Sequence, residues 1–73
     1  MRNFSVTIKR ANKEQSVVVS NIQQATGLAT TFLIRNCAVE IYPTTDQVTH
    51  KNTAKAQADI DMVLMGFELS AVS

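Results

Sequence analysis

The sequence predicts a small α+β domain, in which one mainly antiparallel sheet carries two helices on one face in the order β-β-α-β-α-β. Apolar and polar residues alternate near the N-terminus, around residue 40 and near the C-terminus, and this period of two is typical of strands. Two intervening segments repeat their apolar residues at helical steps of three and four. A chain of 73 residues is long enough for one two-layer domain, residues 1–73.

Two strands joined by a short connection open the chain. Residues 4–8 alternate with a period of two and are rich in β-branched side chains, which indicates a half-buried strand. Residues 9–15 are polar and predict a turn, and the three valines at 17–19 predict the second strand. The short connection favours an antiparallel hairpin. The side chains of the first strand expected to face the core are Phe4, Val6 and Ile8.

The first helix is expected over residues 21–35, after a capping box formed by Ser20 and Gln23. We expect Gly27 to let this helix approach the sheet closely. Asn36 stands where a left-handed residue would end the helix. The apolar residues that share one helical face are Ile22, Ala25, Leu28, Ala29 and Phe32.

A third strand is expected over residues 37–42. Val39 and Ile41 are expected to face inward, because Glu40 belongs on the opposite face. Pro43 is expected to end the strand, since proline cannot donate a hydrogen bond to a neighbouring strand. Residues 47–50 admit two interpretations, a short edge strand or a loop.

The second helix is expected to begin near Thr53 and to end at Gly66, and residues 67–71 predict a final strand. The apolar surface of this second helix is wider than a surface helix needs. The helix is therefore either deeply covered by the sheet or partly covered by another chain, with Met62 and Met65 as the interface. The apolar stripe consists of Ala56, Ile60, Val63 and Leu64, and it is widened by Ala58, Met62 and Met65.

Side chains suited to catalysis are few. Cys37 and His50 would form a nucleophile–base pair only if the fold placed them side by side, and the sequence shows no third member of such a site. We expect a buried Cys37 and a polar His50 on the surface or in a loop instead. A single cysteine and a single histidine cannot complete a four-ligand zinc site, so neither a metal nor another cofactor is expected. The sequence therefore predicts a protein that is not an enzyme.

Charge is unevenly distributed along the chain. Residues 1–36 hold five basic and one acidic side chain, for a net charge of +4, whereas residues 37–73 hold two basic and five acidic ones, for −3. The whole chain therefore carries +1. A dipolar surface of this kind can orient a partner. No apolar run approaches the ~20 residues that span a bilayer, so we expect no membrane contact. A single cysteine without an apolar signal segment suits a reducing compartment, so we expect a cytoplasmic location.

The basic end of the hairpin is the candidate binding site. Arg2 is expected to join it, and Arg35 is expected to add charge from the first helix. Whether this surface meets phosphate or an acidic protein surface is open, although the low net charge and few aromatic residues disfavour nucleic acid. The side chains expected at the hairpin tip are Lys9, Arg10 and Lys13.

The order of the first elements also suggests a family. Phe4-Ser5-Val6-Thr7-Ile8, Val17-Val18-Val19 and Ala38-Val39-Glu40-Ile41-Tyr42 resemble, in arrangement and chain length, small phage and mobile-element host-takeover proteins, among them anti-CRISPR proteins. The resemblance covers about the first 42 residues and includes no shared motif, so no functional residue is carried over. It implies an inhibitor that covers a surface of a host complex without catalysis.

Together these observations favour a non-enzymatic binding protein whose partner is a protein or ribonucleoprotein complex. One alternative is a small nucleic-acid-binding regulator that uses the basic hairpin. Another is an assembly subunit that forms a homo-oligomer, since a lone core of this size supplies only about 3–5 kcal/mol of stability.

Overall fold

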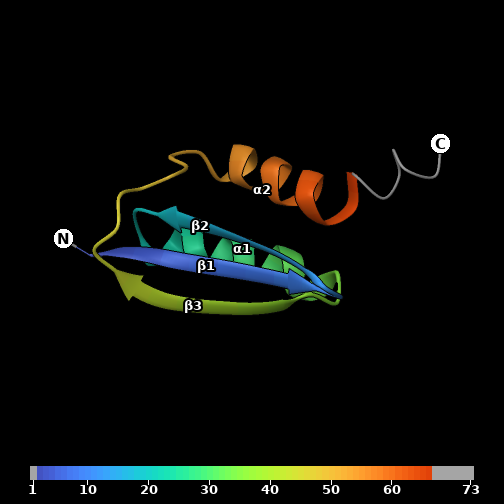
Figure 1. Ribbon diagram of the computed structural model, residues 1–73. Helices are drawn as coiled ribbons and strands as arrows, with labels where there is room; N and C mark the ends of the chain where they lie inside the picture. Colours follow the sequence, from blue (N-terminus) through green and yellow to red (C-terminus); the bar gives the residue numbers. More distant parts are fainter. Residues whose placement is uncertain (1, 67–73) are drawn as a thin grey trace.

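The computed structural model describes residues 2–66, which form the predicted two-layer α+β architecture. The three strands make one antiparallel sheet in the order β2-β1-β3. Figure 1 shows α1 across one face of the sheet and α2 along the β2 side. The final predicted strand, residues 67–71, lies outside the described residues. The elements are β1 (Asn3–Arg10), β2 (Lys13–Val19), α1 (Ile22–Ile34), β3 (Ala38–Thr44), α2 (Thr53–Asp61) and the π-helical turn η1 (Met62–Gly66).

The strands of the hairpin are longer than the polar residues 9–15 suggest. The predicted turn over residues 9–15 is wrong, because strand pairing continues as far as Arg10 opposite Lys13 and only Ala11 and Asn12 form the connection. Hydrogen bonds between strands join backbone groups, so polar side chains do not interrupt them. Ala11 has φ 54°, a left-handed conformation that lets the chain reverse within two residues.

The core lies between the helices and the face of the sheet that carries alternate residues of β1. Val6 is fully buried and lies opposite Val17 on β2 and Ile41 on β3, so these three side chains share one face. Both helices contribute to this core. Its buried residues are Val6, Ile8, Val17, Val19, Ala25, Leu28, Phe32, Cys37, Ala56, Ile60 and Leu64, with Phe4, Val39 and Val63 packed against them.

The start of α1 differs from the predicted one by a single residue. Asn21 is the N-cap, and its Oδ1 accepts from the Gln24 N–H at 2.9 Å. Gln24 Oε1 accepts in turn from the N–H and the hydroxyl of Ser20, at 3.1 and 3.0 Å. Asparagine caps a helix as well as serine does, so the capping box shifts forward from Ser20 and Gln23. At the other end, the left-handed Asn36 is confirmed by its φ of 64°.

Two expectations about α1 are wrong. Ile22 is 50% exposed, because it lies on the flank of the buried stripe. Gly27 is exposed and faces away from the sheet, and a Cβ built there meets nothing within 4 Å. The close approach expected at Gly27 therefore does not occur, and the glycine only weakens the helix.

Replacing Gly27 with alanine is expected to stabilise the protein by about 0.5–1 kcal/mol, because alanine restricts the unfolded chain and fits the open space. Thermal unfolding followed by circular dichroism measures the effect, and the midpoint should rise by roughly 4–8 °C for each kcal/mol. Gly27→Asn is the control, since asparagine forms helices less well than alanine and should give a smaller gain. A lower midpoint for Gly27→Ala would contradict this account.

Pro43 does not end the third strand, which continues through it to Thr44. Peptide groups along a strand point alternately to its two sides, and β3 has β1 on one side only among the described residues. The nitrogen of Pro43 lies on the other side, at the edge of the sheet. Proline is tolerated there because no hydrogen bond to β1 is lost.

The long connection and the second helix complete the described chain. Residues 47–50 are a loop rather than an edge strand. The buried stripe of α2 and η1 is narrower than expected, since Ala58 is exposed and Met62 is 58% exposed. The π-helical turn follows directly after Asp61, and Leu64 within it is part of the core. Within residues 2–66 there is no helix with the length and apolar character needed to cross a bilayer.

Candidate functional site

The candidate site is the end of the β1–β2 hairpin. The turn residues Ala11 and Asn12 are exposed, and β1 and β2 lead into them as a paired ribbon. Lys9 lies opposite Glu14, and Arg10 lies opposite Lys13. Lys9, Arg10 and Lys13 thus all lie at the tip, in two cross-strand pairs that also include Glu14.

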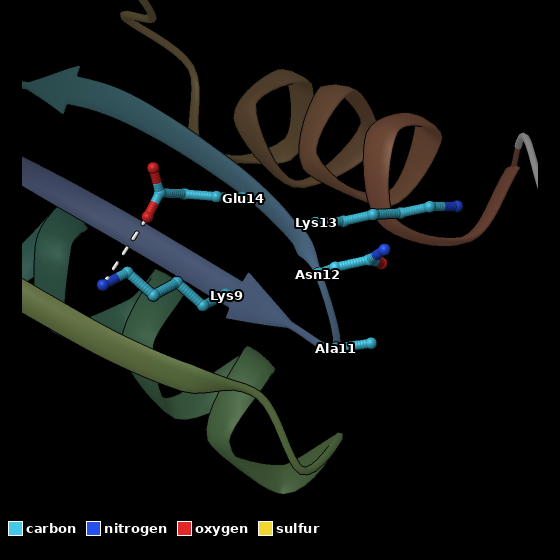
Figure 2. A pocket seen from close by; sticks show the side chains of 5 residues that line it. All are labelled: Lys9, Ala11, Asn12, Lys13 and Glu14. Carbon is cyan, nitrogen blue, oxygen red and sulfur yellow. Dashed lines mark ion pairs between the residues drawn. The ribbon is translucent and has the colours of Figure 1, made fainter.

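Lys9 lies between two carboxylates. Its Nζ is 3.5 Å from Glu14 Oε1 and 3.6 Å from Glu40 Oε1, so it links all three strands on the face opposite the helices. Figure 2 shows Lys9 and Glu14 turned toward each other. All three side chains are substantially exposed, so these pairs add little stability. They nevertheless offset the charge of Lys9 locally.

Arg10 and Lys13 lie on the other face of the hairpin. Side chains alternate along a strand, so Arg10 shares the helix-side face with Ile8 rather than the face of Lys9. Both Arg10 and Lys13 are half-buried, and Lys13 makes an interaction of its own. The fold therefore brings the three basic residues to one end but divides them between two faces.

An open hollow of about 330 Å³ lies beside the turn. Figure 2 shows Asn12 and Lys13 extending in the opposite direction from Glu14. The chemistry of this hollow is mixed, because two ammonium groups, a carboxylate and an amide border it. Such a surface can accept a polar side chain of a partner protein. The lining residues are Lys9, Ala11, Asn12, Lys13 and Glu14.

Arg2 does not join the hairpin tip, contrary to expectation. It precedes β1, whose eight residues separate it from the turn by roughly 25 Å at ~3.3 Å per residue. There it borders a second hollow, of about 490 Å³, with Pro43, Thr44 and Thr45. The reason is that β1 is a single extended strand, so its two ends lie at opposite ends of the sheet.

Arg35 connects the two helices. Its guanidinium pairs with the Asp61 carboxylate and lies 5.2 Å from the centre of the Phe32 ring. The arginine thus bridges the last turn of α1 and the end of α2. Its predicted contribution to partner binding would have to come from a side chain that already has two partners.

The proposed interface on the second helix is placed only in part. Met62 is 58% exposed, so it is open to a partner. The side chain of Met65 lies outside the described part of the structure. The predicted interface at Met62 and Met65 stays a prediction.

His50 lies in the loop before α2, as one of the two expectations had it, but its side chain is largely covered rather than on the surface. Its side chain is 13% exposed, and its Nε2–H donates to Asp59 Oδ2 over 2.6 Å. Its Nδ1 lies 3.1 Å from Thr49 Oγ1. Thr49 Oγ1 also accepts from the Val18 N–H at 2.8 Å, so the hydroxyl connects the loop to the outer edge of β2. Sequence reasoning missed this chain of contacts, because only the fold brings residue 18 to residues 49 and 59.

Cys37 and His50 have different partners. Cys37 is 6% exposed and belongs to the core, and its Sγ donates weakly to the Arg35 carbonyl over 3.9 Å. The contacts of His50 are with Thr49 and Asp59. The expectation of a buried cysteine is confirmed.

Comparisons of the chain with protein-family models, with curated proteins and with solved structures each gave no significant match.

Proposed function

We propose that this chain is a non-enzymatic binding protein that occupies, and inhibits, a surface of a larger protein or ribonucleoprotein complex. The outline that it shares with small phage and mobile-element proteins supports this role, and we place it in the cytoplasm of a host cell. The hairpin end is the contact region. The observation that carries the proposal is the position of Lys9 between Glu14 and Glu40.

That position favours a protein partner over nucleic acid. Three basic and two acidic side chains gather near the tip, so the local formal charge is only +1. Nucleic-acid binding draws its affinity from several uncompensated cations that replace counterions on phosphates. A protein surface with charges of both signs suits a mixed cluster better, because each lysine and glutamate can exchange its present partner for one across the interface.

The triple variant Lys9→Ala, Arg10→Ala, Lys13→Ala is expected to reduce capture of the partner by at least ~10-fold without unfolding the protein, since these side chains lie outside the core. Capture from cell extract on immobilised protein, quantified by mass spectrometry, measures this effect. The matched control is Arg2→Ala with Lys51→Ala and Lys55→Ala, which likewise removes three positive charges, all exposed and away from the hairpin tip. If the control loses as much partner capture as the triple variant, the effect comes from net charge, and the hairpin is not the binding site.

A titration with generic DNA and RNA at about 50 and 200 mM salt tests the alternative class. We expect weak binding at the lower salt and no measurable binding at the higher one. Tight binding with a steep dependence on salt, abolished by the triple variant, would replace the protein partner with nucleic acid.

A further inference from the structure

Helix α1 has no charged side chain in any of its 13 residues. Surface helices normally carry charged residues on the face turned to water. Here the exposed part of one flank carries two large apolar side chains instead: Ile22 is 50% exposed and Leu33 56%. An uncharged helix with exposed isoleucine and leucine indicates a surface that another molecule covers.

The two flanks of α1 differ. One flank faces α2 and the loop before it, through contacts of Gln24 with the Lys51 carbonyl, of Thr31 with Gln57, and of Arg35 with Asp61. The other flank carries Ile22 and Leu33, which lie about 20° apart around the helix at ~100° per residue. Because α1 packs over β1 and β3, this second flank lies along β3.

Strand β3 has no neighbour on its outer side within the described chain. The N–H and C=O of Val18 bond to Thr49, so they point away from β1. Ser5 lies opposite Val18, so the N–H and C=O of Ser5 point the other way, toward Tyr42 of β3. By alternation, the peptide groups of Val39 and Ile41 then face the outer edge. Ile41 is 36% exposed on the side of the sheet that carries α1.

We infer that a second copy of the chain covers this α1–β3 surface, with two β3 strands pairing antiparallel about a two-fold axis at Ile41. This inference concerns a surface other than the hairpin and does not depend on the proposed function. The α1–β3 surface consists of Ile22, Leu33, Val39, Ile41 and Pro43.

The edge hydrogen bonds of this pairing are self-complementary. Each Ile41 N–H donates to the Ile41 carbonyl of the other copy, and each Val39 N–H donates to the Pro43 carbonyl of the other copy. Pro43 has no N–H of its own, so every outward N–H of these residues has an acceptor, while the Val39 carbonyl receives no hydrogen bond from Pro43. Pairing centred on Glu40 would instead place two carboxylates directly opposite each other, which is unfavourable.

The lengths of β3 and α1 show which part of α1 lies level with Ile41, where the two-fold axis passes. From Ala38 to Ile41 the strand advances about 10 Å at ~3.4 Å per residue, and about seven helical residues cover that length at ~1.5 Å each. Counted back from the end of α1, this brings Ile41 level with Gly27. Along the helix, Gly27 lies about midway between Ile22 and Leu33. The two-fold axis therefore places Ile22 of one copy opposite Leu33 of the other.

The lateral spacing also fits two copies. Because α1 lies over both β1 and β3, its axis runs about half a strand spacing inside β3. Strands lie ~4.8 Å apart, so the two α1 helices come to about 10 Å from each other, close to the 8–10 Å of packed helices. One arrangement therefore satisfies the strand edges and brings the exposed leucine and isoleucine into contact.

Charge favours a second copy over other occupants. The α1–β3 surface contains no charged side chain, so two identical surfaces meet without repulsion. Nucleic acid would require cations here. A small domain also gains from burying further apolar surface, because its own core is limited.

Sedimentation of the full chain over a range of micromolar concentrations tests the inference. We expect a dimer whose dissociation constant rises at least ~10-fold in Leu33→Lys. Ile34→Lys adds the same charge at the next position on the helix, and Met62→Lys adds it on the other predicted interface, so both should leave the dimer unchanged. A monomeric wild type, or a dimer dissociated by Met62→Lys but not by Leu33→Lys, would overturn it.

Hydrogen exchange gives a second, independent measurement. The Ile41 amide should exchange at least ~10-fold more slowly in concentrated than in dilute protein, because the dimer gives it an acceptor and no strand among residues 2–66 does. Protection that is equal at all concentrations would show that the edge is covered within one chain and would overturn the inference.

Discussion

Replacing Phe32 with alanine is expected to leave most of the protein unfolded at room temperature. Phe32 is 1% exposed and is the largest of the fully buried side chains among the described residues. Its truncation costs about 3–5 kcal/mol through lost burial and the cavity left behind. A domain of this size has about that much stability in total. Urea unfolding followed by far-ultraviolet circular dichroism measures the loss.

Two further variants keep this prediction informative if the alanine protein cannot be purified. Phe32→Leu retains much of the apolar volume and should unfold at a lower urea concentration while still folding. Ile34→Ala removes an exposed side chain from the same helix and should change stability by less than ~0.5 kcal/mol. A folded Phe32→Ala protein with nearly unchanged stability would show that the core does not depend on this ring.

Replacing Thr49 with valine is expected to destabilise the protein by about 1–3 kcal/mol, although Thr49 lies in a loop. Its Oγ1 accepts from the Val18 N–H at 2.8 Å, and its own N–H donates to the Val18 carbonyl at 2.9 Å. Valine keeps the shape but removes the acceptor. The partly buried Val18 amide would then lack its partner, and His50 would lose a neighbour at Nδ1.

Exchange of the Val18 amide, observed by NMR, separates this mechanism from a general loss of stability. In Thr49→Val the amide should exchange faster than others in β2, whereas Thr49→Ser keeps the hydroxyl and should retain most of its protection. If Val18 were equally protected in the valine variant, the threonine oxygen would not be its acceptor in solution.

The two proposed surfaces are compatible with each other. The hairpin tip lies at one end of the sheet, and the α1–β3 surface lies along its side. Antiparallel pairing of two β3 strands would place two hairpins at opposite ends of a continuous sheet. A dimer of this kind would present two identical contact regions to a larger complex.

Periodicity in the sequence was sufficient to predict that the described strands and helices exist, although not the full length of the three strands. Alternation at Val6 and Ile8 and helical spacing of Leu28 and Phe32 identify core faces, because a side chain's direction follows its position along a regular element. The left-handed Asn36 could also be predicted, since a helix end has local requirements.

What only the tertiary structure decided depends on neighbours distant in the chain. Pro43 lies within a strand because that strand is at an edge, and Gly27 touches nothing because the helix turns it outward. The acids beside Lys9 and the carboxylate beside His50 come from other elements. The spacing of apolar residues in the sequence indicates which way a side chain points. The side chains that it contacts depend on how the strands and helices pack. The fold class was therefore determined by the sequence alone, and the character of the hairpin end by the assembled sheet.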